Sequence, residues 1–162
     1  MASIIKTVSL VEFKSRINFA KWVNRLIDLA FQVATWSSRP ASRQHGCVLA
    51  VDGRFIVATG YNGTAAGEPS CACDVEEIDT CSKYLCPVVH GEINAIINAA
   101  KVNAPLERCV AYLTKAPCLT CRSALKNAGV VAVVWCEGNE QTGASPRSAE
   151  LFSDEWPLWN QH

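Results

Sequence analysis

The 162-residue sequence has no excess of charge of either sign, no long apolar run and no internal repeat. Its 15 basic side chains balance 15 acidic ones. Proteins that bind nucleic acid usually carry a basic excess, so no nucleic acid partner is expected. No run of about 18 apolar residues occurs, so we expect no membrane span. Charged residues make up 19% of the chain and apolar residues 49%, a balance that excludes intrinsic disorder and predicts a packed core.

The first residues also lack the apolar segment and the small-residue cleavage site of a secretory signal. We therefore expect a cytoplasmic protein, in which disulfides rarely persist. Against these absences stand nine cysteines in a chain of 17.6 kDa. Metal binding is the leading interpretation of them, and buried apolar thiols are the alternative. A chain of this size is expected to fold as a single domain over residues 1–162.

Apolar periodicity and turn signals divide the chain into helices and strands. The predicted helices run from Asn18 to the break at Ser37, over Val88–Ala100, over Pro117–Asn127 and, as a short one, over Pro146–Phe152. The predicted strands are Cys47–Val51, Phe55–Ala58, Cys109–Leu113 and Val130–Trp135. The pair Asp52-Gly53 between the first two strands indicates a tight hairpin. Residues 1–17 are interpreted as an arm or a leading strand, and no strand is recognisable after Ser145.

This order of elements predicts an α/β fold. We expect a three-layer sandwich in which a mixed sheet of about five strands has helices on both faces. Strand–helix–strand alternation in the second half implies parallel neighbours there, because a crossover helix returns the chain in the same direction. The core is expected at about residues 19–137, with a cysteine-rich insert at about residues 68–87.

Two short motifs combine residue types that bind a catalytic metal. His90 and Glu92 belong to one predicted helix, and Cys118 and Cys121 follow Pro117 at the start of another. Residues three apart lie on one helix face, and the dipole of a helix start is expected to lower the thiol pKa values towards the metal-binding thiolate. Three ligands leave the fourth position of a zinc ion open for water, and Glu92 is spaced to act on that water without binding the metal.

The same motifs are also compatible with a structural zinc site or with a redox pair. A closed structural zinc site would need a fourth ligand, for which Cys109 or Cys86 is available. A thioredoxin-like redox pair at Cys118 and Cys121 would also stand at a helix start, but it would leave His90 without a role.

The combination of His-x-Glu with Pro-Cys-x-x-Cys resembles the signature of zinc nucleobase deaminases. The chain from about Phe19 to Glu137 looks like the deoxycytidylate (dCMP) deaminase family within that cytidine deaminase-like superfamily. The resemblance lies in the segments GYNG at residues 60–63, HGEINAIINAA and AYLTKAPCLTC. One departure is Gly91, where the family usually has alanine. Glycine keeps the backbone N–H that is expected to meet the pyrimidine O2, at a cost in helix propensity of about 1 kcal/mol.

The resemblance implies hydrolytic deamination of dCMP to dUMP and ammonia, a reaction that supplies dUMP for thymidylate synthesis. It implies that His90, Cys118 and Cys121 bind the catalytic zinc. Glu92 would carry protons from the zinc-bound water to ring N3 and then to the leaving amino group. The alternative is deamination of another cytosine nucleotide or nucleoside, 5-substituted dCMP included, or of a nucleic acid.

Further contacts to the nucleotide are expected from residues outside these motifs. The resemblance implies that Asn62 contacts the sugar. The loop before Gly46 offers basic and hydroxyl side chains for the phosphate, and the candidates there are Arg39, Ser42 and Arg43. Trp135, at a strand end, is expected either to stack on the base or to pack in the core.

A second group of cysteines lies in the insert, where several members of the family carry a structural zinc. These candidates are Cys71, Cys73, Cys81 and Cys86. Three or four of the thiols would close a tetrahedral site, with His45 or Cys47 as a further ligand; otherwise they are free thiols of a loop. Cys109 and Cys136 lie on predicted strands and are expected to be buried, and the terminal His162 is expected to play no part.

Members of the family are typically oligomers that are often activated by dCTP and inhibited by dTTP, usually with Mg²⁺. The resemblance therefore implies a homo-oligomer, from dimer to hexamer, and a control site that includes Lys101. Lys101 equally suits the end of its helix as a solvated cation that is favoured by the helix dipole. The tryptophan-rich C-terminus is expected to cover a subunit interface.

Overall fold

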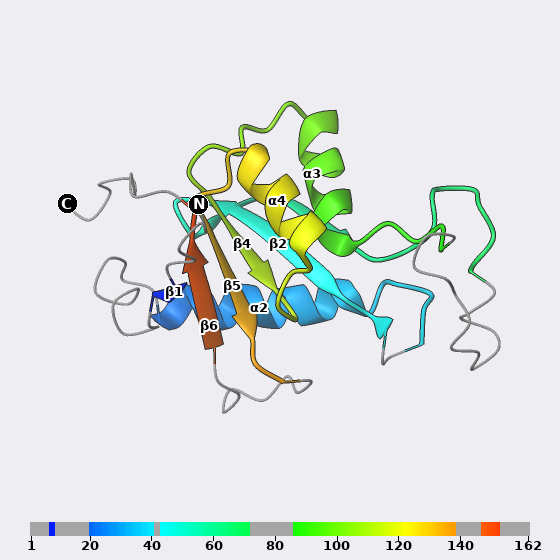
Figure 1. The fold of residues 1–162 in the computed structure, drawn as a ribbon, viewed down its shortest axis with the longest axis horizontal. Helices are drawn as coiled ribbons and strands as arrows, with labels where there is room; N and C mark the ends of the chain where they lie inside the picture. The colour runs from blue at the N-terminus through cyan, green and yellow to red at the C-terminus, as the bar shows by residue number, and fades with distance from the viewer. Residues whose placement is uncertain (1–6, 9–19, 41–42, 72–85, 139–146, 153–162) are drawn as a thin grey trace.

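The computed structural model describes residues 7–8, 20–40, 43–71, 86–138 and 147–152. A six-stranded sheet in the order β1-β6-β5-β4-β2-β3 forms its centre (Figure 1). The strands are β1 (Thr7–Val8), β2 (Gly46–Val51), β3 (Phe55–Tyr61), β4 (Cys109–Leu113), β5 (Ala132–Cys136) and β6 (Arg147–Leu151). The helices are α2 (Ala20–Ala34), α3 (Gly91–Lys101) and α4 (Leu119–Asn127). In this part of the chain, no helix has the length and apolar character needed to cross a membrane.

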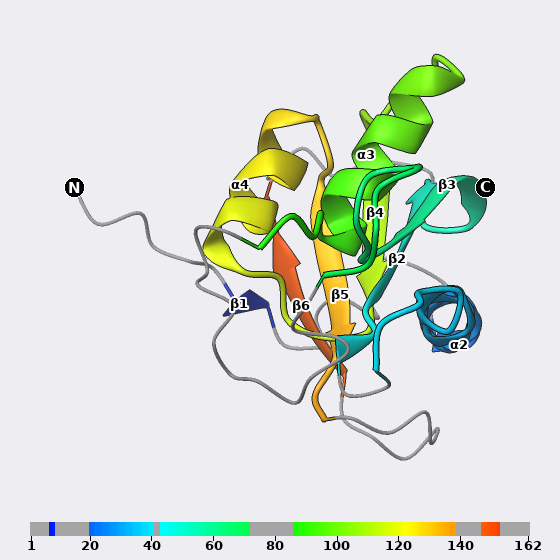
Figure 2. The same cartoon turned by 90° about the vertical axis from the view of Figure 1, so that its right-hand side faces the viewer.

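The three layers follow from the alternation of side chains along the strands. Helix α2 covers one face of the sheet, and α3 and α4 cover the other (Figure 2). On β4, Val110 and Tyr112 pack towards α2, whereas Ala111 and Leu113 pack towards α3 and α4. Both sides of β4 are therefore apolar and buried, as expected of a central strand that has helices on both faces. The predicted α/β sandwich is confirmed.

The hairpin that leads into the site is also confirmed. Strands β2 and β3 pair antiparallel, and three residues, 52–54, separate them. Within this loop Asp52 and Gly53 both have positive φ, 53° and 72°, as the two central residues of a type I′ turn do. Strand β3 continues to Tyr61, further than the predicted end at Ala58, so it delivers the next residue, Asn62, to the end of the sheet.

Helix α3 lies unusually close to strand β3, which forms one edge of the sheet. A Cβ atom on Gly60 would lie 2.3 Å from the backbone nitrogen of Ala95, so the approach requires glycine. Asn94 donates a side-chain hydrogen bond to the Tyr61 carbonyl at 2.8 Å, and Asn98 donates to another carbonyl of β3 at 2.9 Å. These contacts fix the start of α3 against the end of β3, where the site is built.

One predicted element is wrong. Residues 146–152 were expected to form a helix with no strand after Ser145, but Arg147–Leu151 is strand β6, antiparallel to β5. The segment looks polar because of Glu150, whose carboxylate is buried and forms a two-oxygen ion pair with Arg122 of α4. The partner of Glu150 comes from a distant part of the chain, so no local pattern reveals the strand.

Two further expectations about the sheet are confirmed in part. Strand β5 runs parallel to β4, as the crossover predicts, but β6 reverses direction, so the second half of the sheet is mixed. Within residues 1–17, the leading-strand alternative holds at Thr7–Val8, which forms β1 beside β6.

Candidate active site

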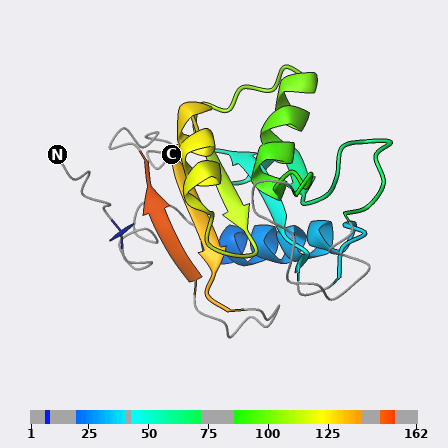
Figure 3. The same ribbon diagram turned by 45° about the vertical axis from the view of Figure 1, so that its right-hand side comes forward.

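The site begins at two neighbouring helix starts. His90 and Cys118 are the N-cap residues of α3 and α4, and both have extended backbone, with φ/ψ of −69°/151° and −66°/163°. The helices therefore begin at Gly91 and Leu119, slightly later than the predicted starts at Val88 and Pro117. Helices α3 and α4 lie side by side on one face of the sheet (Figure 3). Each cap thus projects its side chain ahead of its helix, towards the other cap.

Three of the predicted ligand atoms lie together. The His90 Nδ1 atom is 3.6 Å from Cys118 Sγ and 3.3 Å from Cys121 Sγ, and all three atoms lie within 4.8 Å of one another. Tetrahedral zinc bonds to nitrogen and sulfur would separate such atoms by about 3.6 Å. One imidazole and two thiols, at this spacing and on rigid helix starts, therefore fit a zinc ion that has one coordination position left open.

The electrostatics of Cys121 differ from the sequence-based expectation. The dipole of the helix start was expected to lower its pKa. Instead, burial raises the pKa of the Cys121 thiol well above its usual range, and the nearby Glu92 carboxylate and Cys118 raise it further. Burial outweighs the helix dipole here, because the side chain is almost wholly enclosed. A bound cation is therefore what would stabilise the thiolate at this position.

The alternatives to a catalytic metal site receive no support from the described residues. His90, Cys118 and Cys121 form the only group of three such ligands found there, and neither Cys109 nor Cys86 joins it. The Cys109 thiol is buried and points instead to the Pro105 carbonyl at 3.6 Å. A redox pair is also less suitable, because the imidazole of His90 lies as close to each thiol as a shared ion would require.

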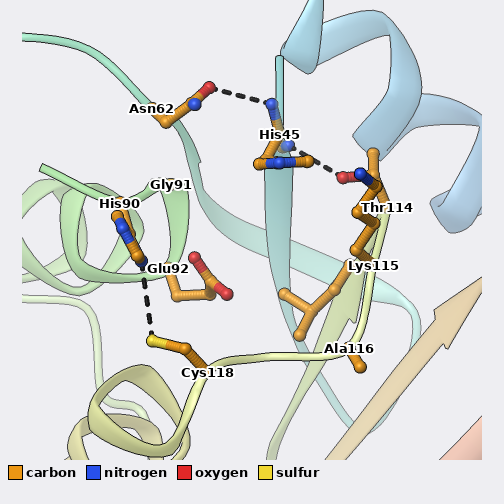
Figure 4. A pocket seen from close by; sticks show the side chains of 11 residues that line it. His45, Asn62, His90, Gly91, Glu92, Thr114, Lys115, Ala116 and Cys118 are labelled. Carbon is orange, nitrogen blue, oxygen red and sulfur yellow. Dashed lines mark hydrogen bonds between the residues drawn. The ribbon is translucent and has the colours of Figure 1, made fainter. Parts of the chain in front are cut away.

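A cavity of about 180 Å³ opens beside the three ligands, and Glu92 points into it (Figure 4). The volume suits one ring-sized group rather than a large ligand, since sites for drug-sized molecules span about 300–1,000 Å³. His90, Gly91 and Cys118 line it together with Glu92. The carboxylate therefore shares one small space with two of the three metal ligands, as a proton-transferring group must.

Asn62 and Gly91, which were predicted to contact the nucleotide, form part of the cavity wall. The Asn62 side chain is buried; its Oδ1 accepts from the His45 N–H at 2.8 Å and its Nδ2 donates to the Arg43 carbonyl. Asn62 thus holds the loop before β2 in addition to facing the cavity. A Cβ atom on Gly91 would lie 3.1 Å from the His45 carbonyl oxygen, so glycine allows this loop to pack tightly on the start of α3.

The other residues predicted to contact the nucleotide either do not line the cavity or lie outside the described residues. Arg39 is buried near the cavity, and Arg43 is half-buried at the end of the same loop, but neither side chain is part of the cavity wall. Ser42 lies outside the described residues. Trp135 packs against the core under α3 and α4, and its indole N–H donates to Glu137 at 3.0 Å. It does not line the cavity, so the packing alternative describes its position.

Among the cavity-wall residues that were not predicted to contact the nucleotide, three have polar side chains: His45, Thr114 and Lys115. Thr114 and Lys115 directly follow β4, and ligands in α/β sheets bind beyond the carboxyl ends of strands, so their position offered a signal. His45 was considered only for a second zinc site. It gives no local signal for the cavity, because its position depends on the pairing of β2 with β3 and β4.

The cysteines of the insert are described in part. The sulfur atoms of Cys71 and Cys86 lie 3.8 Å apart, whereas Cys73 and Cys81 lie outside the described residues. Cys47 is buried beneath α3, and His45 faces the catalytic cavity, so neither completes a group of three ligands with this pair. Cys109 and Cys136 are buried, as predicted. His162 also lies outside the described part, and Lys101 is exposed at the end of α3.

This geometry defines a class of protein. A mixed α/β sheet with a His–Cys–Cys cluster at two helix starts, beside a carboxylate in a small cavity, is an arrangement for metal-dependent chemistry on a small substrate. The family described as "Cytidine and deoxycytidylate deaminase zinc-binding region" matches residues 20–137. The chain belongs to this family, and its His–Cys–Cys cluster lies within the matched residues and could hold the zinc ion that the description names.

Individual proteins agree with this assignment. Deoxycytidylate deaminase of Homo sapiens is 30% identical over 153 residues, which cover 90% of this chain and 81% of the human protein. The deoxycytidylate deaminase of Mus musculus is 28% identical over the same shares of the two chains. Among solved structures, the dCMP deaminase of cyanophage S-TIM5 in complex with dCMP and dUMP aligns with a TM-score of 0.52 and 26% identity. The alignment covers 74% of this chain and 76% of the phage chain.

Proposed function

We propose that the protein catalyses the hydrolytic deamination of dCMP to dUMP and ammonia, and so supplies dUMP for thymidylate synthesis. The observation that carries the proposal is the placement of Glu92 in one small cavity with two of the three metal ligands, His90 and Cys118. Relatives named deoxycytidylate deaminase align over most of the chain, and a similar structure is solved with dCMP and dUMP. These relatives support dCMP as the substrate.

The residues of the chain divide the work between proton transfer and positioning. When bound, zinc supplies Lewis-acid activation of water at neutral pH. The Glu92 carboxylate accepts a proton from the attacking water and passes it to ring N3 as the C4–O bond forms. It then transfers the second proton, from the hydroxyl group now on C4, to the amino group. The C4–N bond breaks as the C4 carbonyl forms, ammonia leaves, and the product is a uracil ring. The backbone N–H of Gly91, the first residue of α3, is the proposed donor to the pyrimidine O2.

The nucleotide's sugar and phosphate are assigned to the loop before β2 and to the end of β4. Asn62, which is part of the cavity wall, is the candidate contact to the sugar. The candidates for binding the phosphate remain Arg39, Ser42 and Arg43. Lys115 is a further candidate, because this cationic residue lines the cavity. A nucleotide with one phosphate carries close to two negative charges at pH 7, so a charged partner of this kind is required.

A comparison of substrates tests the proposal and its alternative. Purified protein with zinc is incubated separately with dCMP, 5-substituted dCMP, CMP, deoxycytidine, dCTP and short single-stranded DNA, and released ammonia is measured. We expect the highest kcat/KM with dCMP. A higher kcat/KM with another cytosine nucleotide or nucleoside would favour the alternative substrate, and activity on DNA alone would contradict the proposal. Glu92→Gln is the control, since its release of ammonia should fall about 10²- to 10⁴-fold.

A second, structural zinc in the insert forms part of the proposal. The 3.8 Å between the sulfurs of Cys71 and Cys86 equals the separation of about 3.8 Å expected for two thiolates on one tetrahedral zinc. It is well beyond the bond of about 2.05 Å in a disulfide. Cys73 and Cys81 are the candidates for the other ligands. Metal analysis should find two zinc ions per chain in the wild type and one in Cys71→Ser, with Cys136→Ser as the control that retains both.

Regulation and oligomeric state are also proposed, on the basis of the family resemblance. We expect a homo-oligomer, between dimer and hexamer, that is activated by dCTP and inhibited by dTTP with Mg²⁺, and that resides in the cytoplasm. Lys101, exposed at the end of α3, is the candidate regulatory contact, and the adjacent Val102 exposes 66% of its surface. Light scattering gives the assembly state, and dCMP saturation curves with and without dCTP test the regulation. Curves that do not respond to either nucleotide would contradict it.

A further inference from the structure

His45 occupies a fixed place in the wall of the catalytic cavity. Its N–H donates to Asn62 Oδ1 at 2.8 Å, and its carbonyl accepts from the Asn62 N–H at 3.1 Å. The following residue, Gly46, donates its N–H to Thr114 Oγ1 at 3.2 Å. Figure 4 shows the His45 side chain between Asn62 and Thr114, away from Cys118. Hydrogen bonds therefore hold the backbone of His45 on both sides and fix the direction of its imidazole.

The imidazole of His45 has no evident structural purpose. Its Nδ1 atom is shielded from solvent and has no hydrogen-bond partner within the described structure. Burial, reinforced by the nearby positive charge of Lys115, lowers the pKa of His45 to about 4, so the ring is neutral near pH 7. An aliphatic side chain would fill the same wall without leaving a polar atom unpaired. A buried polar group that gains nothing from the fold is typical of a functional site.

The cavity needs a surface for the base, and His45 provides the suitable one. Among the described residues that line the cavity, His45 and His90 carry the only aromatic rings, and His90 is a metal ligand. Trp135, the residue first considered for stacking, packs in the core instead. Planar aromatic side chains, histidine included, are the usual partners of nucleobase faces. A neutral ring at this position can pack against a pyrimidine without repelling Lys115.

We propose that His45 is a base-contacting residue, whose imidazole packs against the pyrimidine ring of the nucleotide and selects for a planar base in this cavity. The inference rests on the proposed function, since it takes a pyrimidine nucleotide as the ligand. It assigns a specificity-determining role to a residue that precedes β2 and lies outside both metal-binding motifs.

Equilibrium binding of two ligands to the zinc-loaded protein separates this role from a purely structural one. dUMP carries the base, whereas 2-deoxyribose 5-phosphate has the sugar and phosphate without it. Stacking on an aromatic side chain changes affinity about 5- to 150-fold. We expect His45→Ala to weaken dUMP binding about tenfold or more and to leave the binding of 2-deoxyribose 5-phosphate unchanged. The proposed ring contact stabilises the bound substrate and the transition state equally. Its loss should therefore raise KM for dCMP and leave kcat nearly unchanged.

Further variants keep the result interpretable. His45→Phe keeps a flat ring and should retain most of the dUMP affinity, whereas His45→Leu, of similar bulk, should not. Phe55→Leu is the matched control: Phe55 is exposed at the far end of the β2–β3 hairpin, and the variant should bind both ligands like the wild type. Zinc content, measured for every variant, should stay constant.

Each outcome bears on a separate claim. If His45→Leu and His45→Ala bind dUMP as the wild type does, or lose dUMP and 2-deoxyribose 5-phosphate equally, the proposed ring contact is wrong. Loss of zinc in His45→Phe and His45→Leu would show that His45 supports the metal site instead. Failure of the wild-type protein to release ammonia from dCMP would contradict the proposed function but not the ring contact, because the dUMP measurement does not depend on turnover.

Discussion

The two faces of the central sheet differ in what they bury. The face under α2 is covered by one helix and packs apolar side chains such as Ile27, Val48 and Val134 almost without exposure. The face under α3 and α4 is equally apolar beneath the helices, but at their N-termini it opens into a cavity that holds His90 and Glu92. We therefore expect the α2 face to contribute to stability alone, and the face under α3 and α4 to combine an apolar core with the polar groups of the reaction. Substitutions on the two faces should separate these roles.

The largest effect is expected on the functional face, at Glu92. Glu92→Gln keeps the size of the side chain but removes the carboxylate that moves the proton, so kcat should fall about 10²- to 10⁴-fold. Zinc content and stability should stay close to those of the wild type, because Glu92 is outside the ligand group. Ammonia release and metal analysis test both statements. Loss of zinc in this variant would mean that Glu92 belongs to the metal site.

The next effect is expected on the α2 face, at Ile27, which is fully buried. Ile27→Ala removes three carbon atoms from a packed core and should lower the free energy of unfolding by about 2–5 kcal/mol. The value of kcat measured at a temperature where the variant is folded should not change. Ile97→Ala on α3, where the side chain is 42% exposed, is the matched control and should cost within about 0.5 kcal/mol. Urea unfolding gives both values, and a large loss of kcat in Ile27→Ala would contradict the separation of the two faces.

The features predicted from the sequence are those that depend on local pattern. The Asp52-Gly53 turn was predicted because two residues with positive φ suffice to define it. The pairing of Cys118 with Cys121 at a helix start was predicted because both belong to one turn of α4. The approach of His90 to these thiols was predicted from the residue types of the two motifs and again from the family resemblance. Spacing alone does not give it, since it depends on how two helices pack.

The features that were missed depend on contacts between distant segments. Strand β6 is stabilised by pairing with β5 and by the ion pair between Glu150 and Arg122, neither of which leaves a periodic pattern in residues 147–151. His45 enters the cavity because Asn62, 17 residues later, holds its backbone. The raised pKa of Cys121 depends on burial under the completed fold, which a helix-dipole argument does not include.

The ion pair between Arg122 and Glu150 joins α4, on the functional face, to β6, the strand next to the edge strand β1. Arg122→Leu would leave the Glu150 carboxylate buried without its partner, because Glu150 is 6% exposed. Removing one partner of a fully buried pair costs about 3–5 kcal/mol. Because the Arg122 side chain is 22% exposed, solvent screening reduces the expected loss of unfolding free energy to about 2 kcal/mol.

A double-mutant cycle separates the pair from the packing around it. Glu150→Gln in the Arg122→Leu background removes the unpaired charge, so it should restore part of the lost stability. In the wild-type background the same substitution should be destabilising. Chemical unfolding of the four proteins gives the coupling energy. Additive effects of the two substitutions would show that the pair contributes no net stability.

The smallest effect is expected at Tyr112, which lies in the core of the α2 face and donates a hydrogen bond to the Gly53 carbonyl at 2.7 Å. Tyr112→Phe should cost about 1 kcal/mol at pH 7, because it leaves a buried carbonyl without its donor. Tyr61→Phe, at a tyrosine that is 39% exposed, is the control and should have no measurable effect on the free energy of unfolding.

The stability difference between the wild type and Tyr112→Phe should shrink as the pH rises above about 10. Burial raises the pKa of Tyr112 well above its ordinary value in the folded protein, so the folded state keeps the proton. The unfolded chain releases that proton near pH 10, which stabilises the unfolded wild type but not the unfolded variant. The contribution of Tyr112 is therefore complete below the unfolded pKa and is lost above it. Urea unfolding of both proteins at pH 8 and above pH 10 measures the change, and a difference independent of pH would show that Tyr112 ionises as readily when folded as when unfolded.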